Sequence, residues 1–327
     1  MANKVESAGV SIEKLDARAK DTSAFASRLQ QFVGITGAAQ AARKAFRDAY
    51  KAISDLDKVM TEMAVVTDLE VGDYWEQMPE HTKRASELGI AITEAYEAEM
   101  LYYQQGLKNN QVIGMANETL KMARIANLSA KDATDKMTAA LRGFNMELNE
   151  TSVERVADVY SKLAAITASD VKEISNAMTK TASIAASAGM EFETTAAFLS
   201  QIVETTRESA ETAGTALKTV IARFQELKKD PSEIGEVDGE IVDANKIETA
   251  LRTVGVSLRD ASGQFRELDD VFLELSSKWD SLDTNTQRYI ATVAAGSRQQ
   301  SRFIAMMADY GRTQELVTAA NNSAGAS

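Results

Sequence analysis

Hydrophobic residues recur along most of the chain at intervals of three and four positions, the spacing of one face of an α-helix. The first clear stripe contains Ile53, Leu56, Val59, Met60, Met63 and Val66. Comparable stripes follow within 115–127, 133–144, 153–166, 171–182, 192–203 and 217–227. The pattern predicts an all-α chain, a multi-helix packed or elongated helical array.

Polar residues mark where several helices begin. Ser129, with Asp132 three positions later, is typical of a capping box, and 151–154 repeats that signal. The segment 167–170 is expected to open a further helix, as is the segment that begins at Phe192. Pro79 is expected to start or break a helix. The many small residues of 182–189 would allow two helices to approach closely.

Period-two alternation is clearest around residues 256–267. Val256 and Leu258 precede the turn sequence 260–263, which contains Gly263, and Phe265 follows. This arrangement predicts one small β-hairpin near 256–267.

The pattern divides the chain into five segments. They are a helical N-terminal arm (1–50), a helical core region (51–229), an acidic loop (230–246), a helix, hairpin and helix that end the core region (247–310), and a helical tail that leads into a linker (311–327). Weak apolar faces suggest that the arm pairs with another copy or another segment. The linker-like end suggests a fragment of a longer chain.

Composition narrows the class of protein. Only 2 of 327 residues are proline, too few for an all-β sandwich or barrel. The chain has no cysteine, which excludes a disulfide scaffold, a zinc-thiolate site and a cysteine nucleophile. Its single histidine, His81, excludes a multi-histidine metal site. We find neither a run of about 18 apolar residues nor the apolar core of a signal peptide.

The charge is strongly negative but uneven. The formal net charge is −12, whereas a general nucleic-acid binder is usually basic. Residues 1–51 carry nine Lys or Arg and five Asp or Glu, a net charge of +4. This segment is an ordinary basic arm or a docking arm for an acidic partner.

Few residues are candidates for chemistry. His81 lies in a charged stretch and is expected on the surface. The acidic residues of 230–243 lack the spacing of a calcium loop and are expected to be solvated. No phosphate-binding glycine motif is present.

Paired acids and tryptophans also have structural explanations. Glu94 and Glu97, and Glu204 and Glu208, lie at helical spacing, and such pairs on one helix turn usually face solvent. Trp75 and Trp279 are expected to pack in a core or groove. We therefore predict no catalytic, cofactor-binding or metal site, no cofactor, and no enzymatic activity. The small-residue helices of 157–188 are expected to pack within the chain, and a membrane or a partner helix is the alternative.

Short motifs occur in a specific order from about Leu56 to Tyr310, roughly three quarters of the chain. They include 102–107 (YYQQGL), 141–146 (LRGFNM), 213–219 (AGTALKT), 251–257 (LRTVGVS), 260–266 (DASGQFR) and 295–300 (AGSRQQ). Each motif is weak alone. Together they resemble the core region of phage tail tape measure proteins of the TP901 type, apart from the acidic segment 230–246, which is longer than expected.

The resemblance implies a structural role in the virion. Such proteins lie in several copies in the lumen of the tail tube, set tail length during assembly, and leave with or ahead of the DNA at host entry. The implied partners are other copies, the tail tube protein, baseplate or tail-tip proteins and tail-assembly chaperones, with possible contact to the host envelope and no sequence-specific nucleic-acid binding.

Other hypotheses remain open at this point. One is a membrane-active pore-forming helical protein or a coiled-coil protein, although we find no heptads sustained over three or four turns. Another is a wall-degrading enzyme, for which the sequence contains no supporting constellation. Liposome leakage and a wall-degradation assay would separate these from the structural role.

Overall fold

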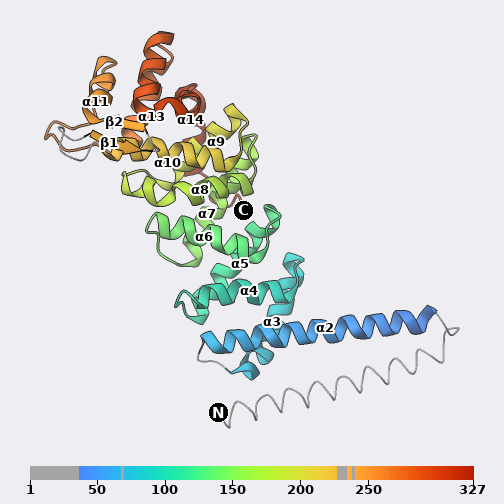
Figure 1. Cartoon of the computed structure of the whole chain (residues 1–327). Helices are drawn as coiled ribbons and strands as arrows, with labels where there is room; N and C mark the ends of the chain where they lie inside the picture. Colours follow the sequence, from blue (N-terminus) through green and yellow to red (C-terminus); the bar gives the residue numbers. More distant parts are fainter. Residues whose placement is uncertain (1–36, 68–69, 227–233, 238–239) are drawn as a thin grey trace. The chain divides into compact units, whose positions relative to one another are not determined.

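The structure is a computed structural model that describes residues 37–67, 70–226, 234–237 and 240–327. The chain divides into two compact units, the first ending at Asn117 and the second beginning at Glu118. Helices provide nearly all the regular structure of the described residues (Figure 1), which confirms the all-α prediction. Residues 1–36 of the predicted arm lie outside the described residues, and its remainder is the start of α2.

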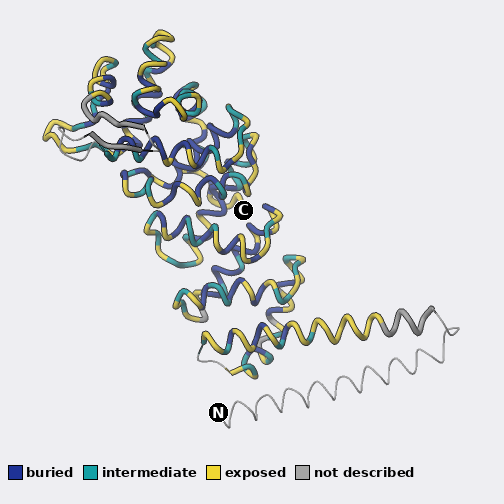
Figure 2. The backbone as a smooth tube through the Cα atoms, in the orientation of Figure 1, coloured by how far each residue is buried: buried dark blue, intermediate teal, exposed yellow. Residues whose placement is uncertain are grey.

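Among its described residues, the first unit contains three complete helices: α2 (Gly37–Val66), α3 (Val71–Leu88) and α4 (Ile92–Tyr103). The helix α5 (Asn109–Ile125) begins in this unit and ends in the next. The helix α2 packs on α3 and α4, and Leu56, Met60 and Met63 of its C-terminal half are buried. The described N-terminal part of α2 is exposed (Figure 2).

Pro79 corrects one prediction. The helix α3 runs from Val71 to Leu88 without ending at this proline. Pro79 is exposed, so the ring faces solvent. Packing of the buried residues on the other side, such as Tyr74 and Ala85, offsets the missing backbone hydrogen bond. The left-handed Gly89 ends the helix instead.

The second unit contains the remaining helices and one pair of strands. In chain order these are α6 (Ala130–Gly143), α7 (Glu150–Ile166), α8 (Val171–Ser187), α9 (Phe192–Thr206), α10 (Ala210–Glu226), β1 (Ile234–Val237), β2 (Glu240–Asp243), α11 (Ala244–Thr253), α12 (Leu268–Trp279), α13 (Thr284–Met307) and α14 (Tyr310–Asn321).

The core of the second unit lies around α8 and α9. The helix α8 contacts α6, α7, α9 and α10, while α9 also contacts α13 and α14. The predicted stripe of α7 is inward, since Val153, Val156, Val159, Tyr160 and Leu163 are fully buried. Aromatic rings link the layers edge to face: Phe272 of α12 contacts Phe198 of α9 and Phe224 of α10.

Three of the four predicted helix starts are confirmed, and α9 is one of them because it begins at Phe192. The hydroxyl of Ser129 accepts a hydrogen bond from the N–H of Asp132 at 3.0 Å. Asp170 and Glu173 form a reciprocal capping box at the start of α8. The start of α7 differs from the prediction, because Asn149 caps it before the expected Thr151. Asparagine is at least as good an N-cap as threonine. The Asn149 side chain accepts the N–H of Ser152 at 2.9 Å, so the helix begins before Thr151.

The predicted hairpin at 256–267 is wrong. A single bridge joins Arg259 and Phe265, around a turn in which Asp260 accepts hydrogen bonds from the N–H groups of Ser262 and Gln264. Helix ends limit the pairing, since the N–H of Val256 bonds to Leu251 of α11 and α12 begins at Leu268. The described strand pair, β1 and β2, lies instead within the segment predicted as an acidic loop and is antiparallel.

Candidate functional site

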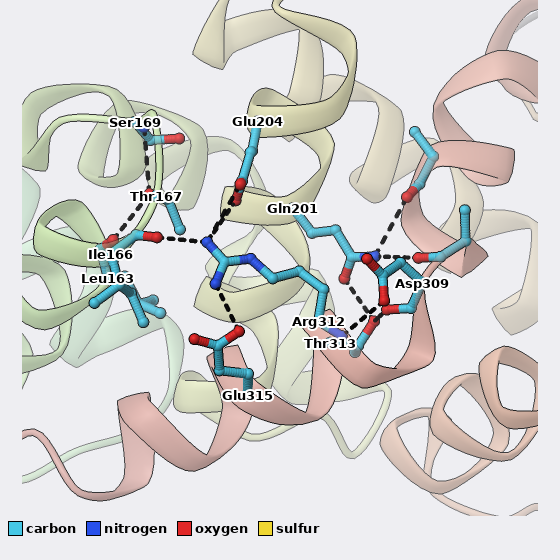
Figure 3. Close-up of polar contacts among 12 residues, drawn as sticks. Leu163, Ile166, Thr167, Ser169, Gln201, Glu204, Asp309, Arg312, Thr313 and Glu315 are labelled. Atoms are coloured by element: carbon cyan, nitrogen blue, oxygen red, sulfur yellow. Dashed lines mark hydrogen bonds and ion pairs between the residues drawn. The ribbon is translucent and has the colours of Figure 1, made fainter.

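The C-terminal helix α14 is attached to α7 and α9 by polar side chains, which we call the α14 cluster: Gln201, Glu204, Arg312, Thr313 and Glu315 (Figure 3). One nitrogen of the Arg312 guanidinium lies 3.1 Å from Oε2 of Glu204 and also donates to the carbonyl oxygen of Ile166. The other lies 2.8 Å from Oε2 of Glu315. One side chain therefore joins α14, α9 and the end of α7.

A neutral pair lies beside this cation. The hydroxyl of Thr313 donates to Oε1 of Gln201 at 2.6 Å, and the Gln201 amide donates to the carbonyl oxygen of Ala308 at 2.5 Å. Both Thr313 and Gln201 are buried. Their mutual hydrogen bonds remove the free-energy cost that an unpaired buried amide or hydroxyl would carry.

The turn before α14 sets the direction of the Arg312 and Thr313 side chains. Asp309 has left-handed backbone angles, with φ 59°, and its carboxylate accepts the N–H of Arg312 at 3.0 Å. This is an N-cap, which fixes where the helix begins. Arg312 and Thr313 consequently lie in the first turn of α14, both directed toward α9 (Figure 3).

Charge stabilises the cluster. Burial alone would lower the pKa of Arg312, but hydrogen bonds to Glu315 and Glu204 outweigh it and raise the pKa above its usual value. The guanidinium therefore stays protonated at every relevant pH. A guanidinium that keeps its charge therefore joins α14 to α9 and to the end of α7.

The residues after α14 are attached at a second point on α7. The Asp158 side chain is buried, with an exposed fraction of 3% for the residue. Its two oxygens accept the backbone N–H groups of Gly325 and Ser327, each at 2.7 Å. A carboxylate that receives two backbone donors is well compensated for its burial. The α14 cluster and Asp158 together attach 309–327 to the α7–α9 layer.

Glu204 and Glu208 do not form the solvated pair expected from their spacing. Glu204 pairs with Arg312 of α14, and Glu208 forms a two-point ion pair with Arg302 of α13. The partners are 108 and 94 residues away in the sequence, so no local pattern could reveal them. These arginines are the residues that sequence reasoning missed.

His81 corrects another prediction, because it is buried rather than on the surface. Its exposed fraction is 2%, and its Nδ1 lies 3.0 Å from Oε1 of Glu99, which is equally buried. The ring stacks on Tyr96 with 4.5 Å between centroids. His81 belongs to α3 and Glu99 to α4, so the pair connects two helices of the first unit.

The other sequence candidates behave as packing or surface residues. Trp279 is buried edge to face against Phe303, as expected, and Trp75 is half-buried. Glu94 and Glu97 are exposed on α4, also as expected. The side chains of 230–243 lie outside the described residues, so the expectation that they are solvated stays a prediction.

Each of the six ordered motifs contains a glycine at a position where a side chain would clash or be strained, and Gly214 and Gly296 are two examples. A Cβ on Gly214 of α10 would lie 2.5 Å from the carbonyl oxygen of Ala177 in α8, and the Thr181 hydroxyl donates to the Gly214 carbonyl oxygen at 3.0 Å. Gly296 has φ 76° where two helical segments of α13 meet at a kink. These motifs therefore build the fold rather than a chemical site.

The cluster offers little for chemistry. The Arg312 guanidinium is engaged by two carboxylates and a backbone carbonyl oxygen, and the Thr313 hydroxyl and the Gln201 amide are hydrogen-bonded to each other. Within the ranges that the structure describes, no group of three His, Asp or Glu side chains could hold a metal ion. No helix in those same ranges combines the length and hydropathy of a membrane span.

Comparison with known proteins identifies the family of this chain. A model of the phage-related minor tail protein family matches residues 80–296, about two thirds of the chain. The chain belongs to the phage-related minor tail protein family, and it is a structural protein of the phage tail. No solved protein structure matches the chain.

Proposed function

We propose that this tail protein is the tape measure, the chain that sets tail length. The proposal rests on one observation above all. The motifs that resemble a tape measure core follow one another in the expected order, and the family match covers most of the same region. Around them, about three quarters of the described residues are helical, and a helix converts residue number into length at about 1.5 Å per residue.

A ruler must be extended, whereas these helices are packed. The stripes of α7 to α10 are buried, so the packed form is the one the isolated chain adopts. We propose that the helices unpack or rearrange when the chain enters the tail. The attachments of 309–327 through Arg312 and Asp158 are polar, and water can replace polar contacts at lower cost than apolar ones.

The proposed location is the lumen of the tail tube, where several copies would lie side by side. The partners would be those copies, the tube protein, baseplate or tail-tip proteins and the tail-assembly chaperones. The net charge of −12 supports release with or ahead of the DNA, because an acidic chain does not bind a polyanion. We propose a structural rather than an enzymatic role, and a wall-degradation assay on the purified chain tests that part.

Tail length tests the proposal. The phage gene that encodes this chain would receive an in-frame deletion of a helical stretch outside residues 51–310, and a duplication of the same stretch as the matched control. Electron microscopy should show tails shortened and lengthened by about 1.5 Å per residue, respectively. Normal tails of unchanged length in both phages would contradict the tape measure role.

A further inference from the structure

The helix α13 is bent sharply at one residue. Gly296 has φ 76° and ψ 170°, while the residues on both sides of it are helical. Only glycine adopts this backbone conformation readily. Across the bend, the side-chain amide of Gln300 donates to the carbonyl oxygen of Arg288 at 3.2 Å and to the Thr292 hydroxyl at 3.0 Å. In a straight helix, residues 288 and 300 would be about 18 Å apart, well beyond the reach of a glutamine.

Different elements hold the two halves of α13. In the first half, the carbonyl oxygen of Val293 accepts a hydrogen bond at 3.2 Å from the guanidinium of Arg223, a buried residue of α10. In the second half, the Phe303 ring packs edge to face on Trp279 of α12. Contacts with other helices therefore maintain the bend.

The local sequence favours a straight helix instead. No proline interrupts α13, and the residues around the bend (294–300) are mostly Ala, Arg and Gln, which are strong helix formers. Four buried residues of α13 are spaced four positions apart: Ala291, Ala295, Gln299 and Phe303. A continuous helix would keep these four in one row on its surface. Glycine also adopts helical angles, so Gly296 permits both forms.

We propose that Gly296 is a hinge, and that α13 straightens into one continuous helix when the contacts of its two halves are released. The 24 residues of α13 would then extend over about 36 Å. The Arg223 and Gln300 side chains that hold the bend are polar, and water can replace their contacts. Straightening keeps the hydrogen bonds within each half, whereas melting either half would lose them. The fold therefore contains an element that lengthens without unfolding.

The hinge deepens the proposed function. A helix that lengthens by opening one residue suits a chain that is packed when isolated and extended in the tail. That use in the tail rests on the proposed function, but the hinge itself is a property of the purified chain. A negative result on the hinge would leave the tail-length experiment unaffected, and the reverse also holds.

Distances between two labels test the hinge in the purified full chain, which has no native cysteine. Spin labels on Thr284→Cys and Ser301→Cys, both exposed positions, should be about 26 Å apart in a straight α13 and closer in the bent one. Pulsed electron paramagnetic resonance measures the distance. Gly296→Ala should shift the main distance to the longer value, because alanine is strained at φ 76° and favours helix.

Gly263→Ala is the matched control. Gly263 has φ 85° and open space around its Cβ position, so this variant carries similar backbone strain outside α13. It should leave the distance between the labels short. Circular dichroism separates straightening of α13, which preserves helix content, from melting, which lowers it.

A second variant decides the matter if Gly296→Ala does not fold. Gln300→Ala removes the hydrogen bonds across the bend and should raise the population at the longer distance at least threefold. An unchanged short distance in every variant that folds would overturn the hinge. Longer distances accompanied by a loss of helix content would overturn it as well.

Discussion

Gly214 illustrates, at the scale of single residues, how a short motif is fixed by packing. The helices α8 and α10 approach so closely there that the Ala177 carbonyl oxygen occupies the space of a side chain. The small residues of 182–189 predicted a close helix approach, and the structure shows one there, because a Cβ on Gly143 of α6 would clash with Ala182 of α8. A second close approach lies at Gly214 and Ala177. The partner of the glycine could not be predicted, because it comes from another helix.

Replacing this glycine should destabilise the second unit. Gly214→Ala forces a Cβ to within 2.5 Å of a backbone oxygen, so the free energy of unfolding should fall by about 1–3 kcal/mol. Urea denaturation measures it. Gly311→Ala is the control, because its Cβ would have no contact closer than 3.5 Å. A stability equal to wild type in Gly214→Ala would disprove the close approach.

Asp269 should make stability depend on pH. Burial raises the pKa of this carboxyl from 3.8 to about 7, although its Oδ2 accepts the N–H of Glu191 at 2.7 Å. A folded pKa above the unfolded value means that the folded state binds the extra proton between these two pH values. The contribution of Asp269 to stability should therefore be greatest below about pH 4, fall as pH rises toward 7, and then level off.

The Asp269→Asn variant isolates this contribution. The wild-type chain should lose roughly 2–4 kcal/mol relative to the variant between pH 4 and pH 7. Thermal unfolding monitored by circular dichroism at several pH values measures the difference. Asp270→Asn, at the exposed neighbouring position, should keep the wild-type slope. A wild-type slope in Asp269→Asn would refute the assignment.

His81 shows where sequence reasoning fails at this scale. Its neighbours in the chain are charged, which suggested a surface position. The burial arises from the facing helix, where Glu99 and Tyr96 receive the ring. A polar residue is buried when its partner is available, and that partner is invisible along α3 alone.

At the scale of elements, polar contacts of Arg312 join α14 to α9 and to the end of α7, in addition to the packing of its buried Leu316 and Ala320. Arg312→Met removes the ion pairs to Glu204 and Glu315 and the bond to the Ile166 carbonyl oxygen. Local opening of α14 should then become about tenfold more frequent, the equivalent of losing one charged hydrogen bond. Amide hydrogen exchange of 310–321 measures it.

A surface ion pair provides the control for Arg312. Lys131 and Asp135 pair on α6 with side chains that are 66% and 57% exposed. Lys131→Met should leave exchange of α14 unchanged. If Arg312→Met behaved in the same way, the α14 cluster would not hold the helix.

Elements were predicted well where a local signal determines them. The apolar stripes and the caps at Ser129 and Asp170 are local, and the structure confirms them. The predicted hairpin at 256–267 did not form because the end of α11 and the start of α12 leave room for a single bridge between them. The prediction that a helix begins or breaks at Pro79 failed because packing of the rest of α3 outweighs the tendency of proline to interrupt a helix.

At the scale of the whole molecule, the chain forms two compact units, one of which ends at Asn117. The division along the sequence did not include a boundary there, because the boundary falls within the continuous helix α5. Composition predicted the fold class, because so few prolines argue against an all-β fold and the structure is helical. The structural role was implied by the ordered motifs, and the family match supports it at the level of a phage tail protein.

The central claim is that helices packed in the isolated chain unpack inside the tail. Hydrogen exchange with mass spectrometry, on the purified chain and on intact phage tails, tests it most directly. The claim predicts strong protection of α8, α9 and α10 in the purified chain, where their apolar faces are buried, and weaker protection of the same segments in tails. Equal protection in both samples would contradict it.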